Sequence, residues 1–414
     1  MKPTPKKLIT QPISQPISQT IPQTISPAHL AAVECPIAVA SGMPNAAYTD
    51  REFHRFERDH LFAKTWTALA FCDDHRSEGV VTPVDFMGLP LLIVGDKDGN
   101  SAVFHNVCSH RGMRLVKEAK KTNGLLVCPY HAWTYDLNGA LKATPHIGGV
   151  DANQVEGFHR ENHGLKPVRS HRWMGILFIN LSGDAPDFDT HAAPLIDRYR
   201  QYIGADGGRD LGPAQPDDGL SLEANCNWKL AVENYCEAYH LPWVHPSLNS
   251  YSPLDRHYCM FISDDCAGQG TNTFNPVLDG GTSLPLFPNW PEDKREVAEY
   301  PTFYPNLLLG FQVNHFYALI IHSLGADRIR EELRIFYVGE GATAEQYRPG
   351  RESNLEAWRR VFNEDIDAVE GLQLGRCSPG FGGGVFSPVM DAPTHHFHQW
   401  VARKYRAAYE TAAG

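Results

Sequence analysis

The stretch CSHRGMRLVKEAKKTNGLLVCPYHAW, from Cys108 to Trp133, holds two pairs of metal-binding residues. The first pair is Cys108 with His110 and the second is Cys128 with His131, so the pattern is C-x-H, seventeen residues, then C-x-x-H. Each pair would present one thiol and one imidazole at the tip of a short loop. Two such loops folded against each other would enclose two iron atoms, one held by both cysteines and the other by both histidines.

This mixed ligation is the chemistry of a Rieske [2Fe–2S] centre, in which a histidine pair raises the reduction potential above that of clusters held by cysteines alone. A structural zinc site is the alternative, because zinc also takes cysteine and histidine ligands. The flanking residues Arg111–Gly112 and Pro129–Trp133 favour the cluster, as does the β-rich sequence around them. The four residues therefore predict an electron-transfer centre.

Composition narrows the function classes. The 414 residues are enough for roughly two or three domains. The net charge is −11, from 37 basic and 48 acidic residues, which argues against binding to nucleic acid or to an anionic membrane. No apolar run approaches the roughly 20 residues of a membrane span. The nine cysteines are odd in number and irregularly spaced, which favours the reducing cytoplasm over a secreted disulfide framework.

Residues 1–47 are low in complexity, with QPISQPISQTIPQTIS repeating Gln, Pro, Ile and Ser. Because this composition cannot supply a core and its prolines oppose helix formation, we expect a disordered tail. The lysines at positions 2, 6 and 7 leave a targeting segment open, although no continuous apolar region follows them. A wrongly assigned start codon is another explanation.

Three further regions are expected after the tail. Residues 48–63 predict a helix, capped by Thr49, that belongs to the same domain as residues 184–414. Residues 64–183 alternate apolar and polar residues between Gly, Pro and Asp-Gly turns, which predicts a small antiparallel β domain with the four ligands on its loops. Residues 184–414 mix strand-like runs with expected helices near Leu195–Ile203, Leu230–His240 and Glu352–Glu370. The predicted fold class is α+β, with an antiparallel sheet flanked by helices in the larger, catalytic domain.

A second group of ligands lies in NCNWKLAVENYCEAYHLPWVHPSL, residues 225–248. The spacing of Asn234, Glu237 and His240 would put them on one helical face. His245 does not fit that face, so we expect Pro242 to break the helix and bring the two histidines together. Two histidines and one carboxylate form the facial triad of non-haem Fe(II) oxygenases, which leaves coordination positions open for O₂ and substrate.

Spacing alone does not choose the carboxylate of this triad. Glu237 lies close to His240 in the sequence. The other candidates come from FNEDIDAVEGLQ, on an expected helix far downstream: Glu364, Asp365 and Asp367.

Together these motifs resemble the catalytic α subunit of the Rieske non-haem iron oxygenases, from about Tyr48 to the end of the chain. The matching stretches are FHNVCSHRG, CPYHAWTY, NWKLAVENYCEAYH with a later histidine, and EDIDAVEGLQ followed by HHFHQW. In that family C-x-H-R-G and C-P-x-H-x-W bind the cluster, and H-x4-H with a late aspartate binds a mononuclear iron. The resemblance implies one [2Fe–2S] cluster on Cys108, His110, Cys128 and His131, and one Fe(II) on His240, His245 and Asp365.

The resemblance also gives Glu237 a catalytic role. In the family the acidic residue at this position hydrogen-bonds an iron histidine and a cluster histidine of the neighbouring subunit, which implies a path from His131 to His240 across a head-to-tail homotrimer. Most of the family has Asp here, and the Glu resembles members that act on quaternary amines such as carnitine, glycine betaine and choline. Asn234 is expected to hydrogen-bond near the iron. Ala132 stands where many relatives have Gly.

The implied function is that of a terminal oxygenase component. A separate flavin- or ferredoxin-type reductase would deliver electrons from NAD(P)H, and no G-x-G-x-x-G fingerprint stands out in this chain. We expect O₂-dependent monooxygenation or demethylation of a small organic substrate, with Glu237 pointing to a quaternary amine. An aromatic-ring cis-dihydroxylating dioxygenase is the alternative within this chemistry. A Rieske electron carrier is the alternative from another class, although a carrier would not need the large C-terminal half.

Two further groups are expected to be structural. The histidines of HHFHQW, at positions 395, 396 and 398, look like a metal tract but have no role in the resemblance, so we expect a packed strand or helix. An aromatic run is expected mainly in a sheet core, with a substrate pocket as the alternative: Phe303, Tyr304, Phe311, Phe316 and Tyr317.

Overall fold

The computed structural model describes residues 22, 24–75, 77–96, 100–204, 208–276 and 283–413. The chain forms two compact units, which are described separately below. One spans Leu69–Ala185, and the other combines the described residues before Leu69 with those from Pro186 onwards. The boundaries expected from the sequence, at residues 64 and 183, lie slightly earlier in the chain.

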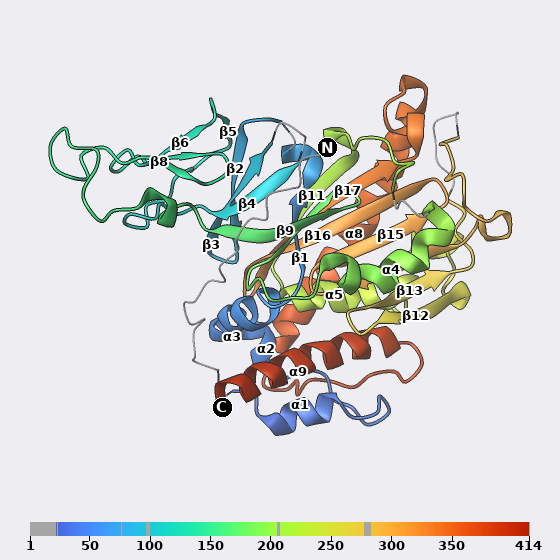
Figure 1. Ribbon diagram of the computed structural model, residues 1–414. Helices are drawn as coiled ribbons and strands as arrows, with labels where there is room; N and C mark the ends of the chain where they lie inside the picture. The colour runs from blue at the N-terminus through green and yellow to red at the C-terminus, as the bar shows by residue number, and fades with distance from the viewer. Residues whose placement is uncertain are drawn as a thin grey trace. The chain divides into compact units, whose positions relative to one another are not determined.

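The smaller unit is built from two β-sheets (Figure 1). The seven-stranded sheet has the order β1-β10-β9-β4-β3-β2-β5, and the three-stranded sheet has the order β6-β7-β8. The strands are β1 (Thr67–Phe71), β2 (Val80–Phe86), β3 (Leu89–Gly95), β4 (Ser101–His105), β5 (Lys120–Lys121), β6 (Leu125–Val127), β7 (Thr134–Asp136), β8 (Leu141–Ala143), β9 (Pro167–Trp173) and β10 (Ile176–Asn180), with short 3-10 turns at Cys72–His75 and Arg160–Asn162.

Local sequence accounts for the hairpins of this unit. Phe86 pairs with Leu89, so β2 and β3 are joined by the two residues Met87 and Gly88. Both have positive φ, 51° and 86°, as a two-residue hairpin turn that follows the strand twist requires. The core beneath the strands includes Leu92, Phe104 and Tyr135, together with both cysteines of the predicted cluster site. The two ligand loops are therefore anchored in a packed core.

The larger unit contains a seven-stranded sheet of order β11-β17-β16-β15-β14-β13-β12. All of its neighbouring strands are antiparallel. The two longest strands, β16 and β17, pair with each other, with His315 opposite Tyr337 at one end of their pairing. The strands are β11 (Gly219–Ala224), β12 (His257–Ser263), β13 (Cys266–Thr271), β14 (Ala298–Phe303), β15 (Leu307–Gln312), β16 (His315–Gly325) and β17 (Arg328–Tyr337).

Helices pack against this sheet and against each other. Helix α5 contacts β14, α8 and α9, while α9 also contacts β12 and β13 (Figure 1). The helices are α1 (Pro27–Val33), α2 (Ala46–Thr49), α3 (Arg51–Glu57), α4 (Phe188–Ile203), α5 (Trp228–Cys236), α6 (Leu241–Val244), α7 (Pro246–Tyr251), α8 (Arg348–Arg376) and α9 (Ala392–Ala413). Shorter turns are the π-helical Arg58–Phe62 and the 3-10 segments Pro216–Asp218, Leu254–Arg256, Glu292–Lys294, Gly339–Ala342 and Glu345–Tyr347.

The sheet and helices confirm the predicted α+β class. Two of the expected helical segments, Leu195–Ile203 and Glu352–Glu370, lie inside α4 and α8. The third, Leu230–His240, is cut short, because α5 ends at Cys236. Within the described residues, no helix combines the length and apolar character that crossing a membrane requires.

The expectation of a structureless tail up to residue 47 is wrong for its second part. Ser26 and His29 form a capping box that starts α1, in which Pro27 occupies the tolerated first turn. Leu30 and Val33 are buried, and α1 packs beside α9 (Figure 1). Prolines therefore did not prevent a helix here. Residues 1–21 and 23, which include most of the glutamine- and serine-rich repeat, lie outside the described residues.

The helix expected at residues 48–63 forms with a different start. Thr49 ends the short helix α2, and Asp50 caps α3 by accepting a hydrogen bond from the Glu52 amide at 2.7 Å. A fully buried carboxylate then ties this region to distant helices. Glu57 accepts hydrogen bonds from Trp228 at 2.9 Å and from both Lys229 and Tyr405 at 2.5 Å.

Candidate metal centres

Two loops of the smaller unit repeat the same turn. In each, the cysteine amide donates to the carbonyl five residues later, and the amide four residues later donates back to the cysteine carbonyl, at 2.8 and 3.0 Å for both Cys108 and Cys128. The residues at the fourth position, Gly112 and Ala132, have φ of 72° and 55°. The two loops thus hold their side chains in matching positions.

The loop tips bring thiols together and imidazoles together. Cys108 and Cys128 are buried, and burial raises the pKa of Cys108, with the neighbouring Cys128 thiol adding to the rise. The rings of His110 and His131 meet edge to face with centroids 4.6 Å apart. Trp133 stacks on His110, also at 4.6 Å. Two sulfur donors therefore lie in the core and two nitrogen donors lie nearer the surface.

Tyr135 orders the buried end of this site. Its hydroxyl lies 3.1 Å from Cys108 Sγ and 2.9 Å from Ser109 Oγ, and it accepts a hydrogen bond from the Ser109 amide at 3.1 Å. Hydrogen bonds to cluster sulfurs are one of the means by which proteins set Fe–S potentials. The hydroxyl is therefore in position to act on a cluster held by this thiol.

The donor geometry fits a two-iron cluster rather than a zinc ion. A tetrahedral zinc would draw all four donor atoms to one point, with metal–ligand distances of about 2.0–2.3 Å. In the described part of the chain, only one group of three or more Cys, His, Asp or Glu donors lies within 4.8 Å of one another, and it does not contain these residues. Separate sulfur and nitrogen pairs are what a [2Fe–2S] centre with cysteine on one iron and histidine on the other needs.

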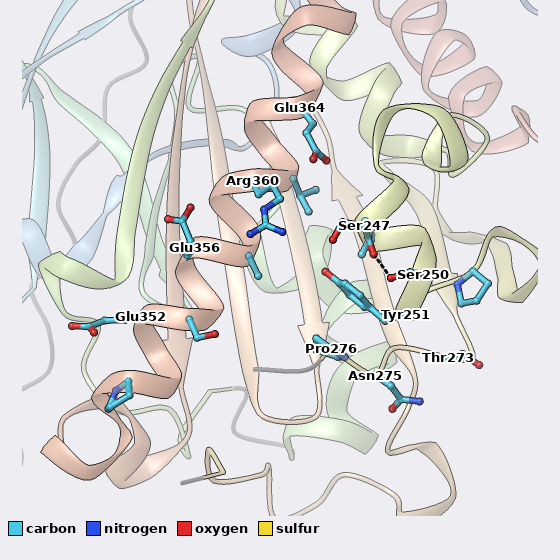
Figure 2. Close-up of a pocket in the computed structure, with 16 residues that line it drawn as sticks. Ser247, Ser250, Tyr251, Thr273, Asn275, Pro276, Glu352, Glu356, Arg360 and Glu364 are labelled. Carbon is cyan, nitrogen blue, oxygen red and sulfur yellow. Dashed lines mark hydrogen bonds between the residues drawn. The ribbon is translucent and has the colours of Figure 1, made fainter. Parts of the chain in front are cut away.

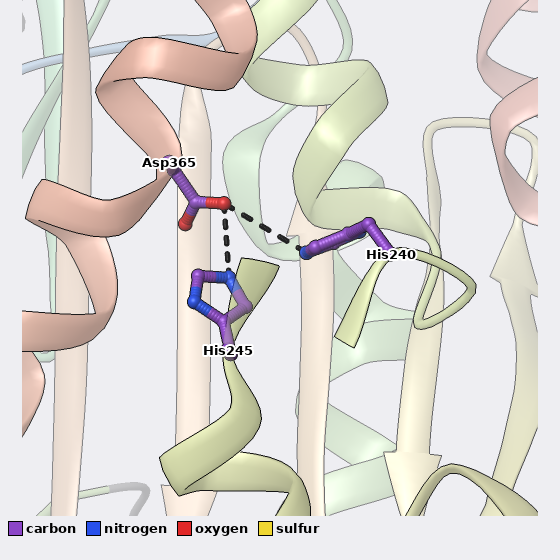
Figure 3. A group of neighbouring side chains, drawn as sticks. All are labelled: His240, His245 and Asp365. Carbon is purple, nitrogen blue, oxygen red and sulfur yellow. Dashed lines mark hydrogen bonds and ion pairs between the residues drawn. The ribbon is translucent and has the colours of Figure 1, made fainter. Parts of the chain in front are cut away.

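That one group is His240, His245 and Asp365, in the larger unit (Figure 3). Asp365 comes from α8, while the histidines flank the short helix α6. The expected helical face is wrong: α5 ends at Cys236, and Glu237 has extended backbone at φ −127° and ψ 162°. The chain therefore turns before His240, and Pro242 begins α6 instead of breaking a longer helix.

Each histidine is held by a carboxylate on one ring nitrogen and faces the metal position with the other. His240 Nδ1 lies 2.6 Å from Glu237, and His245 Nδ1 lies 2.8 Å from Glu364. Their Nε2 atoms lie 3.7 and 3.0 Å from the same oxygen of Asp365 (Figure 3). Carboxylate–histidine pairs of this kind fix the tautomer and ring orientation of metal-binding histidines.

The carboxylates also set the charge of this site. Burial would lower the pKa of His245, but hydrogen bonds and charge from Asp365 and Glu364 outweigh burial and raise that pKa. A divalent cation between the three residues would replace the proton that this arrangement attracts. The donor set, two nitrogens and one oxygen with open positions, is the one that non-haem Fe(II) oxygenases use.

A small cavity of about 40 Å³ lies beside the three residues. Its walls are largely aromatic, and the expected Asn234 on α5 also lines it. The main wall residues are Tyr235, Tyr300, Tyr317, Trp358 and Phe362.

The two halves of the chain match two family descriptions. Residues 65–155 match the Rieske [2Fe-2S] domain, and residues 213–407 match the catalytic domain of the ring hydroxylating alpha subunit. The chain belongs to the Rieske non-haem iron oxygenases. It is therefore an oxidoreductase whose cofactors are a [2Fe–2S] cluster and a mononuclear iron, and the two donor sets described above fit these groups.

Individual Rieske oxygenases are similar over most of this chain. The carnitine monooxygenase oxygenase subunit of Acinetobacter baumannii is 28% identical over 359 residues, covering 83% of this chain and 88% of that protein. The chloroplastic choline monooxygenase of Arabidopsis thaliana is 26% identical, covering 88% and 82%. The crystal structure of the quaternary ammonium Rieske monooxygenase CntA has a TM-score of 0.73 at 23% identity and covers 91% of this chain and 98% of that one. The Acinetobacter baumannii relative is named as the oxygenase subunit of its enzyme.

Two expectations from the sequence remain, for the C-terminal histidines and for the aromatic run. The histidines of HHFHQW lie apart in α9: His395 contacts the Val33 carbonyl, His396 contacts Tyr304 and His398 contacts Glu233. They are packing residues, as expected. Of the aromatic run, only Tyr317 lines the metal cavity. The others are buried, three in strands of the sheet and Tyr304 in the turn after β14: Phe303, Tyr304, Phe311 and Phe316.

The sequence did not reveal the roles of three further residues at the site, Glu364, His257 and Gln269. Glu364 was one of four candidate carboxylate ligands, but it contacts the ring nitrogen of His245 opposite to the one that faces Asp365. Adjacent helical residues point about 100° apart, so the Glu-Asp pair can address two sides of one imidazole. His257 and Gln269 also line the cavity and are linked to Glu237: His257 Nδ1 lies 2.7 Å from Gln269, and the Gln269 amide donates to the Glu237 carbonyl at 2.9 Å.

Proposed function

We propose that this Rieske oxygenase is the terminal component of a system that oxidises a small quaternary amine. The reaction would hydroxylate a carbon bonded to nitrogen, and the product would break down to an amine and an aldehyde. This would be monooxygenation or demethylation, as the glutamate at position 237 led us to expect. The relatives named for carnitine and choline support the same substrate class.

The aromatic wall beside the metal position carries this proposal. Tyr317 and Trp358 have ring centroids 4.5 Å apart, and Phe362 lies 5.9 Å from Tyr317 and 6.1 Å from Trp358. Tyr300 closes another side, 6.2 Å from Trp358. Aromatic cages of this kind bind quaternary ammonium groups, because the ring faces attract a cation that cannot donate hydrogen bonds.

One wall residue is held in orientation from behind. The Trp358 indole donates to His315 Nε2 at 3.0 Å, and His315 is buried. Burial lowers the pKa of His315 to about 3, so the imidazole stays neutral and can accept this bond. The ring plane of Trp358 is therefore fixed before a substrate arrives, which reduces the entropy that binding would cost.

In this proposal Cys108, His110, Cys128 and His131 hold the cluster, and His240, His245 and Asp365 hold the iron. The iron, when bound with open positions, supplies the O₂ reduction and C–H oxidation of this enzyme class. Glu237 and Glu364 keep the imidazoles in the required tautomer. The aromatic side chains exclude water, and Asn234 offers an amide at the edge of the cavity.

We also propose a head-to-tail homotrimer that works with a flavin- or ferredoxin-type NAD(P)H reductase in the cytoplasm. The support is the exposure of aromatic side chains beside each metal site. In the larger unit, Tyr239 and Trp243 are 45% and 72% exposed next to His240. In the smaller unit, Tyr130 is 57% exposed beside His131. In a trimer these faces would meet between copies, and Glu237 would accept a second hydrogen bond from the cluster histidine of a neighbour.

A substrate screen tests the proposal. The enzyme, loaded with cluster and iron and supplied with NADH and a generic reductase, should consume O₂ and release aldehyde with small quaternary amines. His245→Ala should abolish this consumption while the Rieske EPR signal stays. Turnover of small arenes in place of the amines would instead establish the aromatic-ring dioxygenase. Electron transfer that is unaffected by His245→Ala would identify a carrier.

A further inference from the structure

A groove of about 1060 Å³ runs along α8 in the larger unit (Figure 2). One wall is a stripe of charged side chains spaced four residues apart on α8: Glu352, Glu356, Arg360 and Glu364. The facing wall comes from α7 and the segment after β13. It is uncharged, with Ser247, Ser250 and Tyr251 toward the stripe (Figure 2).

The groove and the metal cavity are neighbours. Leu248 and Val361 line both, so these two side chains stand between the groove and the aromatic walls. The metal cavity, at about 40 Å³, is far smaller than the groove, at about 1060 Å³. Only one end of a substrate can therefore sit beside the metal, and the rest must extend past Leu248 and Val361 into the groove.

Arg360 is unusual among the arginines of α8. Four of the five form ion pairs with carboxylates: Arg348 with Glu352 at 2.9 Å, Arg351 with Asp218 at 3.5 Å, Arg359 with Glu356 at 3.2 Å and Arg376 with Glu233 at 3.5 Å. Arg360 has no ion pair or hydrogen bond with any residue in the described parts of the chain. Its neighbours one turn away are engaged elsewhere, Glu356 with Arg359 and Glu364 with His245.

The guanidinium of Arg360 extends from α8 toward the facing wall (Figure 2). The charge of Arg360 acts on Tyr251 across the groove: burial raises the pKa of Tyr251, and the Arg360 charge opposes that rise. Arg360 precedes the metal-facing Asp365 by five residues, which is about 7.5 Å of helix rise. The unpaired, planar and permanently charged guanidinium of Arg360 therefore lies in the groove. Its distance from the metal position is comparable to the length of a small zwitterion.

We propose that Arg360 binds the carboxylate of a zwitterionic substrate whose quaternary ammonium end occupies the aromatic cavity. This inference rests on the proposed function and narrows it: the preferred substrates are betaines, in which a carboxylate lies a few bonds from the ammonium nitrogen. A guanidinium can hold a carboxylate through two parallel N–H···O bonds, a geometry that lysine or a hydroxyl cannot reproduce. Choline, which has a hydroxyl in place of the carboxylate, leaves Arg360 unpaired.

Comparison of carnitine with choline tests the inference in the complete enzyme. Arg360→Gln should lower kcat/KM for carnitine about 10- to 100-fold, mainly through KM, since a charge-assisted bidentate pair is lost. It should leave kcat/KM for choline within about twofold. Arg359→Gln is the matched control, because Arg359 is the adjacent residue on the same helix but does not line the groove. Arg359→Gln should leave kcat/KM unchanged for both carnitine and choline. In calorimetric titrations under nitrogen, where turnover cannot occur, Arg360→Gln should weaken carnitine binding and Arg359→Gln should not.

The outcomes separate the two claims. If the wild-type enzyme oxidises no quaternary amine, the proposed function fails and this inference fails with it. If it oxidises carnitine and Arg360→Gln affects carnitine and choline alike, or neither, the proposed function stands and Arg360 is not the carboxylate site. Unchanged choline turnover in the variant excludes misfolding as the cause of a carnitine loss, and Arg360→Lys should recover only part of the carnitine preference.

Discussion

Ala132 has a left-handed backbone, with φ at 55°, at the position where the other cluster loop has Gly112 at 72°. A side chain beyond glycine costs roughly 1–2 kcal/mol in this conformation, because Cβ approaches the following carbonyl. The hydrogen bonds of the two loops are the same, so the turn tolerates this strain without changing shape. The departure from glycine at this position is therefore a matter of stability and does not alter the loop geometry.

Ala132→Gly should stabilise the smaller unit. Relief of the strain exceeds the backbone entropy that glycine adds to the unfolded chain, which leaves a gain of about 0.5–1 kcal/mol in the free energy of unfolding. Gly112→Ala should have the opposite sign and cost about 1 kcal/mol, since a Cβ there meets no neighbouring atom within 4 Å and only the backbone is strained. Urea unfolding with the cluster loaded measures both, and equal effects of one sign would contradict the strain argument.

Glu364→Gln should weaken iron binding about 10- to 100-fold, as the loss of a carboxylate behind a metal-binding histidine generally does. The cause is that His245 loses the acceptor that fixes its tautomer. Competition with a chelator measures the affinity. Glu356→Gln, two turns earlier in the same groove and bound to Arg359 instead, is the control and should leave iron binding unchanged. Equal iron affinity in both variants would contradict this role for Glu364.

At the scale of helices and strands, local patterns predicted more than long-range contacts did. Capping, turn residues and apolar runs were enough for α4, α8 and the strands β15 to β17. The end of α5 was not predictable, because Glu237 leaves the helix to bind His240 and the Gln269 side chain holds the Glu237 carbonyl from β13. These contacts are tertiary and outweigh the helix propensity of this segment.

In the candidate site, too, local sequence patterns were predictable and long-range contacts were not. Ligand types and spacing were enough to select Cys108, Cys128, His240 and His245 as candidate ligands. Asp365 could be separated from its acidic neighbours only by the resemblance, since one step along a helix changes direction by about 100°. The groove and Arg360 had no sequence signal, because what distinguishes Arg360 is the absence of a partner in three dimensions. The buried Glu57 was invisible for a related reason, as its partners lie at Trp228, Lys229 and Tyr405.

Strand β17 carries a carboxyl group whose titration should be measurable. Glu331 lines a small cavity that also touches Asp365, and burial raises its pKa to about 8 from an ordinary value of 4.5, with the Asp365 charge adding to the rise. Between pH 4.5 and about pH 8, Glu331 is therefore protonated in the folded chain and ionised in the unfolded chain. Its contribution to stability is complete below pH 4.5 and disappears as pH rises to about 8.

In iron-free protein, Glu331→Gln should flatten the fall of stability with pH. The wild-type chain should lose up to about 1.4 kcal/mol per pH unit more than the variant across this window. Glu332→Gln is the control on the opposite face of the strand: burial would raise the Glu332 pKa, but its hydrogen bond with His322 lowers it overall. Urea unfolding at pH 5.5, 6.5 and 7.5 gives the slopes, and parallel slopes for wild type and Glu331→Gln would disprove the assignment.

At the scale of the whole molecule, the exposed aromatic pair Tyr239 and Trp243 makes the assembly testable. Their rings meet edge to face at 5.9 Å, although both are in solvent in a single chain. Trp243→Ala should shift the sedimentation coefficient from trimer to monomer, because buried tryptophans carry about 2–4 kcal/mol or more of interface energy. Turnover should fall with assembly while the cluster EPR signal remains.

Phe261→Ala provides the comparison for this experiment. Phe261 is 57% exposed on β12 and does not line the metal cavity, so the substitution removes an exposed aromatic side chain from another strand. It should leave the proposed trimer intact. A Trp243→Ala protein that sediments as wild type would show that copies do not meet at this face.

The carboxylate pairs behind His240 and His245 have a consequence for handling the protein. Glu237 and Glu364 hold the two imidazoles from behind, so the protein's own hydrogen bonds orient the donors of this site. A preformed site with two nitrogens and one oxygen follows the Irving–Williams order, in which zinc and copper bind more tightly than ferrous iron. Protein produced in a zinc-rich medium should therefore be purified brown from its cluster yet inactive, with zinc in the mononuclear site, and metal analysis should precede any conclusion about substrates.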